Sequence, residues 1–186
     1  MSHHVYTTRG IVLALRSTKE SDKVAAIFTR ELGLIYTTAR GMGKSASKLS
    51  TSLAELCIVK VSLVKGRRLW RVTTVTLLKN IYAELREDRD ALSSLARVLR
   101  LVSTLVKGEE KNAELYDELE SGVEKFTEKT QTTAKLKSKE LYLVSRILFH
   151  LGYLPEQELP KSVEEAEKDE KRVLKIVNES LHASGL

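Results

Sequence analysis

The spacing of apolar residues changes near residue 80, and this change limits what the chain can fold into. Residues 56–64 (LCIVKVSLV) alternate, with apolar side chains on one face and Lys60 and Ser62 on the other. After Asn80, apolar residues recur about every 3.6 positions, as in residues 85–106. A period of two is typical of strands, and a period of about 3.6 is typical of amphipathic helices. The sequence therefore predicts an α+β protein with a β-rich first part and a helical second part.

Five segments of the first part have the alternation or the β-branched content of strands. They are residues 7–16, 24–28, 34–39, 56–64 and 69–78. Between the third and the fourth lies a basic loop, and the end of that loop could form one or two helical turns. This order predicts a five-stranded OB-fold β-barrel. An SH3-like barrel is the main alternative.

Four helices are expected in the second part, and together they form a helical bundle. Their apolar stripes run over residues 85–106, 112–126, 136–151 and 173–181. Gly152 suits the position after the third helix, and Ser162 with Glu165 has the spacing of a capping box before the fourth. The predicted domains are an OB-fold nucleic-acid-binding domain over residues 1–80 and a helical domain over residues 81–186.

Positive charge is concentrated in the predicted barrel. Residues 1–80 contain fourteen Lys and Arg against four Asp and Glu, a net charge of +10. Residues 81–186 contain seventeen bases against twenty-one acids, a net charge of −4. A basic β-domain joined to a mildly acidic helical domain is typical of nucleic-acid-binding proteins. We therefore expect a polyanionic partner.

Composition argues against several other classes of protein. Cys57 is the only cysteine, so neither an intrachain disulfide nor a multi-cysteine zinc site can form. The four histidines are scattered, and we expect no metal and no cofactor. No apolar stretch approaches the roughly 20 residues of a membrane span. The N-terminus lacks the apolar segment of a secretory signal, so a cytoplasmic protein without membrane contact is expected.

The segment GMGKS (41–45) ends like the phosphate-binding pattern G-x-x-x-x-G-K-[ST]. Thr38, however, stands where the first glycine belongs, so we expect no nucleotide hydrolysis. Arg40, Lys44 and Lys48 are instead predicted to contact nucleic-acid phosphates. A merely solvated basic loop is the alternative.

The turn between the fourth and fifth predicted strands is the most basic one in the chain. Lys65, Arg67, Arg68 and Arg71 surround it, where their side chains can reach a phosphate backbone. Trp70 is adjacent, and single-strand binders combine such bases with aromatic rings on which nucleobases stack. The same alternation also allows Trp70 to fill the end of the barrel, and both alternatives remain open.

No residue pattern indicates catalysis. Cys57 lies in the middle of a strand on an apolar face, without a histidine partner in the sequence pattern, so a buried structural cysteine is expected. The acidic run over residues 164–170 is typical of a solvated helix face. We expect no catalytic residues and no enzyme.

An ordered set of short motifs resembles the RecO family of bacterial recombination mediators. The motifs are TRGIVLALR, FTRELGLI, ARGMGKSASKL and KGRRLWRV in the first part, and LVSRILFHLGYLP (143–155) in the helical part. The resemblance covers residues 7 to about 155. It implies an N-terminal OB-fold, a C-terminal helical domain, binding to single-stranded and double-stranded DNA, and annealing of complementary strands.

The resemblance also implies two protein partners. These are RecR and the C-terminal tail of single-stranded-DNA-binding protein, which docks on the helical domain. Many members carry zinc-binding cysteines after the Gly-x-x-Pro element, but here that region reads EQELPKSVEEAEK. We therefore expect no zinc, and whether RecR binding survives without that module stays open.

Annealing needs no reacting side chain, because a basic surface that binds both strands lowers their repulsion and leaves base edges exposed. The predicted phosphate contacts are Arg9, Arg40, Lys44, Lys48, Lys65, Arg67, Arg68 and Arg71, with Trp70 or Tyr36 for stacking. In the helical half, a cation beside an apolar groove would suit an acidic, aromatic-ended peptide. The residues expected there are Leu143, Arg146, Ile147 and Leu151, unless they are only bundle core with one solvated arginine.

Two other functions remain possible from the sequence. One is an OB-fold module that binds RNA or associates with the ribosome, which would prefer structured RNA to single-stranded DNA. The other is a non-enzymatic protein adaptor, whose basic face would meet an acidic partner without binding nucleic acid.

Overall fold

The computed structural model describes residues 4–17, 23–39, 52–128, 132–183 and 185. By their internal contacts these residues form two compact units. The first comprises Met1–Glu84 together with Lys107–Ala113, and the second comprises Leu85–Val106 together with Glu114–Leu186. Each unit is described separately below.

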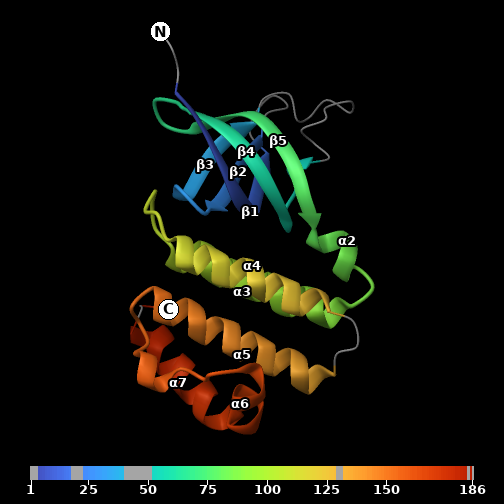
Figure 1. The fold of residues 1–186 in the computed structure, drawn as a ribbon, viewed down its shortest axis with the longest axis vertical. Coiled ribbons are helices and arrows are strands. Elements are labelled where there is room, and N and C mark those ends of the chain that lie inside the picture. Colours follow the sequence, from blue (N-terminus) through green and yellow to red (C-terminus); the bar gives the residue numbers. More distant parts are fainter. Residues whose placement is uncertain (1–3, 18–22, 40–51, 129–131, 184, 186) are drawn as a thin grey trace. The chain divides into compact units, whose positions relative to one another are not determined.

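The first unit is a closed five-stranded barrel (Figure 1). Its strands are β1 (Val5–Ser17), β2 (Lys23–Thr29), β3 (Gly33–Ala39), β4 (Cys57–Lys65) and β5 (Trp70–Asn80). They follow the order β1-β2-β3-β5-β4, with β4 returning to β1. Neighbouring strands are antiparallel except β3 and β5, which pair in parallel through Thr37 and Thr38. This is the predicted OB-fold in an α+β protein, and the SH3-like alternative is set aside.

The barrel interior is filled by the apolar face of each alternating strand. Cys57, Val59, Val61 and Leu63 of β4 all point inward and are fully buried, while Lys60 between them is exposed. The register of β1 against β2 shifts between Val12 and Ala14. A bulge of this kind increases strand curvature, which helps a small sheet to close.

Residues 107–113, here called the strap, lie between two helices in sequence but pack on the barrel. The Leu34 N–H donates to the Gly108 carbonyl oxygen at 3.1 Å, and Lys111 Nζ lies 2.5 Å from Glu31 Oε2. Gly33 has a φ of +69°, and a Cβ there would lie 2.3 Å from the Glu110 carbonyl oxygen. The strap therefore approaches the β2–β3 turn closely enough to require glycine.

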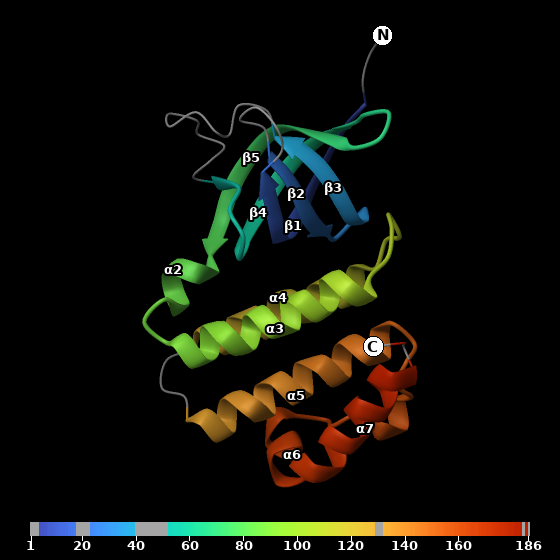
Figure 2. The ribbon, with the colours of Figure 1, turned by 180° about the vertical axis from the view of Figure 1, so that it is seen from behind.

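The second unit is a set of packed helices, which agrees with the α-helical part of the predicted fold class (Figure 2). They are α3 (Arg89–Leu105), α4 (Ala113–Thr127), α5 (Thr133–His150), α6 (Val163–Lys168) and α7 (Glu170–Ala183), with a 3-10 turn at Glu156–Glu158. Helix α5 contacts α3, α6 and α7. A short helix, α2 (Ile81–Leu85), follows β5.

The helix ends follow the predicted capping signals. Ser162 Oγ accepts a hydrogen bond from the Glu165 N–H at 3.3 Å at the start of α6. Gly152 follows α5 with a φ of +79°, a left-handed conformation that glycine adopts without a steric penalty. Among the described residues, no helix is long and apolar enough to cross a membrane.

Candidate nucleic-acid interface

The β4–β5 turn presents the basic cluster that the sequence predicted to meet phosphates. The side chains of Lys65, Arg67, Arg68 and Arg71 are all in exposed positions. The turn is tight at Gly66, where a Cβ would lie 2.3 Å from the Leu69 carbonyl oxygen. Lys65, Arg67 and Arg68 therefore lie at or beside the end of a short hairpin, where long cationic side chains can reach a ligand in solution.

Trp70 is packed inside the barrel. Only 3% of its surface is exposed, and its ring forms an edge-to-face contact with Tyr6 at a centroid distance of 5.3 Å. Its Nε1–H donates to Glu109 Oε1 at 2.9 Å. Of the two alternatives left open for Trp70, the structure supports packing, because bases cannot stack on a ring that is covered in this way.

Two other aromatic side chains on the barrel are exposed. Tyr36 on β3 is 49% exposed and Tyr6 on β1 is 37% exposed. The sequence predicted Tyr36 as a stacking residue, whereas no pattern indicated Tyr6. The Tyr6 ring contacts the Trp70 ring and, at a centroid distance of 4.5 Å, the His4 ring. Both tyrosines are therefore better placed than Trp70 to meet a base.

Glu109 of the strap is a component of this region that sequence reasoning missed. Besides the Trp70 indole, it accepts a hydrogen bond from Lys65 Nζ at 2.9 Å. The Lys65 ammonium lowers the pKa of the Glu109 carboxyl, with the Trp70 hydrogen bond acting in the same direction. Thirty-nine residues separate Trp70 from Glu109, so no local pattern could reveal the pairing. The positive charge of Lys65, one of the four basic side chains of the turn, is thus partly neutralised.

The remaining predicted DNA contacts divide into two groups. Arg9 is exposed on β1, directly opposite Lys60 of β4 in the strand register. Arg40, Lys44 and Lys48, together with the GMGKS segment, lie outside the described residues.

The predicted partner site in the helical unit differs from its expected form. Leu143 and Ile147 are at most 1% exposed, so they belong to the bundle core and not to a surface ridge; Leu151 is only partly buried. Arg146 Nη2 lies 2.9 Å from Glu118 Oε2. Arg146 also lines a pocket of about 460 Å³ with Leu159 and Lys161, among others. Arg146 therefore does lie beside an apolar side chain, but that side chain is Leu159 and not the predicted Leu143 or Ile147.

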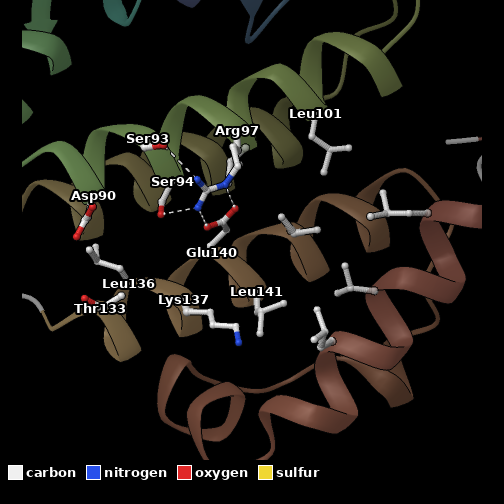
Figure 3. Close-up of a pocket in the computed structure, with 15 residues that line it drawn as sticks. Asp90, Ser93, Ser94, Arg97, Leu101, Thr133, Leu136, Lys137, Glu140 and Leu141 are labelled. Carbon is white, nitrogen blue, oxygen red and sulfur yellow. Dashed lines mark hydrogen bonds and ion pairs between the residues drawn. The ribbon is translucent and has the colours of Figure 1, made fainter.

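A second hollow of the helical unit lies between α3, α5 and α7, with a volume of about 550 Å³ (Figure 3). Its apolar lining includes Leu101, Leu141 and Leu174. Arg97 of α3 reaches Glu140 of α5 with two hydrogen bonds, of 2.8 Å and 2.6 Å. Because this arginine is held by a carboxylate, the groove presents a neutralised ion pair beside an apolar surface.

Within the part of the chain that the structure describes, Cys57 lies in the barrel interior, as expected for a structural cysteine. Cys57 is fully buried, and burial raises the pKa of its thiol, which disfavours the reactive thiolate. Within the same described ranges, no three His, Cys, Asp or Glu side chains are grouped so that they could hold a metal ion.

The strand order defines the class of the protein: an OB-fold barrel, with an exposed basic turn between β4 and β5, followed by a helical unit. Residues 1–81 match the family described as "Recombination protein O N terminal". DNA repair protein RecO of Dehalococcoides mccartyi (strain ATCC BAA-2266 / KCTC 15142 / 195) is 31% identical over 157 residues, which cover 82% of this chain and 58% of that protein.

Two further relatives have the same printed description. DNA repair protein RecO of Clostridium perfringens (strain 13 / Type A) is 31% identical over 109 residues, 59% of this chain and 44% of that protein. That of Caldanaerobacter subterraneus subsp. tengcongensis is 25% identical over 149 residues, 80% of this chain and 58% of that protein. The chain belongs to the RecO family, and the matches span about half the length of these relatives.

Proposed function

We propose that the chain acts in DNA repair and homologous recombination by binding DNA through its barrel and annealing complementary single strands. The observation that carries this proposal is the exposed basic hairpin of an OB-fold in a chain whose relatives are described as DNA repair proteins. An OB-fold barrel is a common support for single-stranded nucleic acid. Both single-stranded and double-stranded DNA are proposed ligands.

The proposed mechanism is electrostatic. Two complementary strands repel each other through their phosphates, and cations that bind both backbones reduce that repulsion. Contacts to phosphates carry no sequence information, and they leave base edges available for pairing. Annealing by this route uses no nucleotide triphosphate and no metal, and no side chain reacts.

Two protein partners are part of the proposal. We infer RecR from the resemblance of the chain alone, with no surface assigned to it. The acidic C-terminal tail of single-stranded-DNA-binding protein would dock beside Arg146, where Lys161 and Leu159 line the same pocket. This location is supported by the chemistry of Lys161 and of Arg146, which is also paired with Glu118, next to an apolar side chain. Such a site suits a peptide with both carboxylates and an aromatic end.

The direct test is a titration of the whole protein with labelled single-stranded DNA at several salt concentrations. Log affinity should fall with log salt by about 0.7 for each phosphate contact. Replacing Arg67 and Arg68 together by alanine should weaken binding to all sequences alike and reduce the slope accordingly. Binding that is insensitive to salt, or equal in this variant, would contradict the proposed surface.

The same titration separates the other two functions. A clear preference for structured RNA over single-stranded DNA at equal salt would favour an RNA-binding module. Absence of any nucleic-acid binding at physiological salt would favour a protein adaptor.

A further inference from the structure

The outer face of strands β1, β4 and β5 carries hydroxyl groups and cations in register. One row across the three strands is Thr7, Ser62 and Thr74, and the next is Arg9, Lys60 and Thr76. Residues directly opposite each other in antiparallel strands project to the same face. Five of these six side chains are exposed and Ser62 is half-buried, so they form one continuous surface, here called the hydroxyl face.

The hydroxyl face brings two like charges together. Arg9 and Lys60 are directly opposite in the register of β1 and β4, where Cβ atoms lie about 4.5–5.5 Å apart. Like charges at that separation destabilise a sheet, and a bound anion reverses the sign of the interaction. None of the three strands contains Asp or Glu, so no carboxylate of β1, β4 or β5 shares the face.

Two carboxylates of the barrel unit, Glu84 and Glu109, pair with lysines at the two ends of these strands. Lys79 Nζ, near the end of β5, lies 3.3 Å from Glu84 Oε2. At the opposite end, Lys65 is paired with Glu109. Lys60 thus lies in the middle of the hydroxyl face, between two ends at which a strand lysine has a carboxylate partner.

The hydroxyl groups of this face can donate hydrogen bonds to a ligand. Thr7 Oγ1 and Ser62 Oγ lie 3.0 Å apart, and either can be the donor. Because each hydroxyl carries one proton, one proton of the pair is used between them and the other can point to an acceptor outside. The exposed hydroxyls of Thr74 and Thr76 add two more potential donors.

We propose that the hydroxyl face binds the sugar–phosphate backbone of a polynucleotide, with the bases turned to solvent. Hydroxyl groups and long cationic side chains are the groups that contact phosphate oxygens, and the face has no aromatic ring on which a base could stack. Lys60 is five residues along β4 from Lys65, about 17 Å at strand spacing, so this site reaches backbone that the turn alone does not. The inference rests on the proposed DNA binding and extends it to a second part of the barrel.

The charge of this face is tested with Lys60→Gln, using Lys79→Gln as the matched control. Both replacements remove one positive charge from the outward positions of neighbouring strands, but Lys79 already has Glu84 as its partner. With labelled oligothymidylate as the probe, Lys60→Gln should weaken binding about fivefold and lower the salt slope by about 0.7. Lys79→Gln should weaken binding less than about twofold.

The hydroxyl groups are tested without any change in charge. In a Thr74→Val, Thr76→Val protein the side-chain shape and the strand preference are kept, so the barrel should fold as before. We expect oligothymidylate binding to weaken about threefold to tenfold, as for the loss of one or two neutral hydrogen bonds, with an unchanged salt slope. A general electrostatic field cannot produce this result, because the net charge of the protein stays the same.

The outcomes distinguish the inference from the function on which it rests. Equal effects of Lys60→Gln and Lys79→Gln would overturn the inference, as would unchanged affinity of the double valine variant with an intact circular dichroism spectrum. If the Arg67→Ala, Arg68→Ala protein then still binds more weakly than wild type, the proposed DNA binding stands without the hydroxyl face. If wild-type protein fails to bind oligothymidylate, the proposed function and the inference both fail.

Discussion

Replacing Gly33 by alanine should separate the barrel from its strap. The Cβ of alanine at this position would lie 2.3 Å from the carbonyl oxygen of Glu110 and 2.6 Å from its backbone nitrogen. These are backbone atoms, so no side-chain rotation relieves the overlap, and the strap itself has to move. Gly108 provides a matched control, because its φ of +82° is also left-handed but a Cβ there meets no atom within 4 Å.

The expected loss in the free energy of unfolding follows from the contacts that Gly33→Ala would disrupt. Left-handed backbone costs a residue with a Cβ about 1–2 kcal/mol, and Gly108→Ala should destabilise the barrel by that amount alone. Gly33→Ala should additionally weaken the hydrogen bond from the Leu34 N–H to the strap and the one from Trp70 to Glu109. At about 1 kcal/mol for each neutral or partly exposed bond, its total cost should be about 3–4 kcal/mol.

The assay is urea unfolding followed by tryptophan fluorescence. Trp70 is the only tryptophan of the chain and is buried in the barrel, so its emission reports on this unit. Gly33→Ala should lower the free energy of unfolding by about 2 kcal/mol more than Gly108→Ala. Equal destabilisation by the two replacements would refute the close approach of the strap to the β2–β3 turn.

Four further predictions use the same protein. Glu109→Gln keeps an acceptor for the Trp70 indole but removes the negative charge beside Lys65, so DNA affinity in filter binding should rise about twofold to fivefold. The control on the same strap, Glu110→Gln, should change DNA affinity less. The pKa of Glu109 is lowered in the folded protein, so the ionised carboxylate stabilises the barrel at pH values above its ordinary pKa of 4.5. This stabilisation is lost as the pH falls through the pKa of the folded state. The free energy of unfolding of Glu109→Gln should therefore depend less on pH in the acid range than that of wild type. Cys57 should resist a thiol reagent at pH 8 in native protein and react in urea, and rapid native labelling would contradict its burial. Arg146→Glu should reduce calorimetric binding of an acidic, Phe-ended peptide, whereas equal affinities would remove Arg146 from the site.

Local patterns were sufficient for most of the fold. The alternation in residues 56–64 predicted both the inward face of β4 and its exposed Lys60, because strand side chains alternate whatever their partners are. The capping pair Ser162 and Glu165 likewise acts within a few residues and appears as predicted. The strap could not be predicted in this way. A glycine at position 108 by itself suits only the end of a helix, while the packing of residues 107–113 depends on Gly33, which is far away in sequence.

In the candidate site, too, local sequence patterns predict which charged side chains are exposed but not which distant residues they meet. Exposed cations such as Arg67 and Arg68 are predictable, because charges at a turn remain solvated in almost any fold. Leu143 and Ile147 could be placed on one helix face from their spacing, but spacing does not say whether that face meets solvent or other helices. Lys60 was correctly assigned to a polar face, yet its significance depends on Arg9, which only the register of β1 and β4 brings opposite.

Trp70 illustrates why charge is the stronger guide to a binding surface than an aromatic residue. A large ring gains more from burial than a base can offer by stacking at about 1–3 kcal/mol, so a tryptophan near a barrel end tends to be covered when a partner for its N–H exists. Glu109 supplies that partner here, and it lies in the strap, outside the five strands. The cations have no such alternative inside the barrel, because their desolvation would cost several kcal/mol. They therefore remain on the surface, and the phosphate contacts proposed for this protein depend on them.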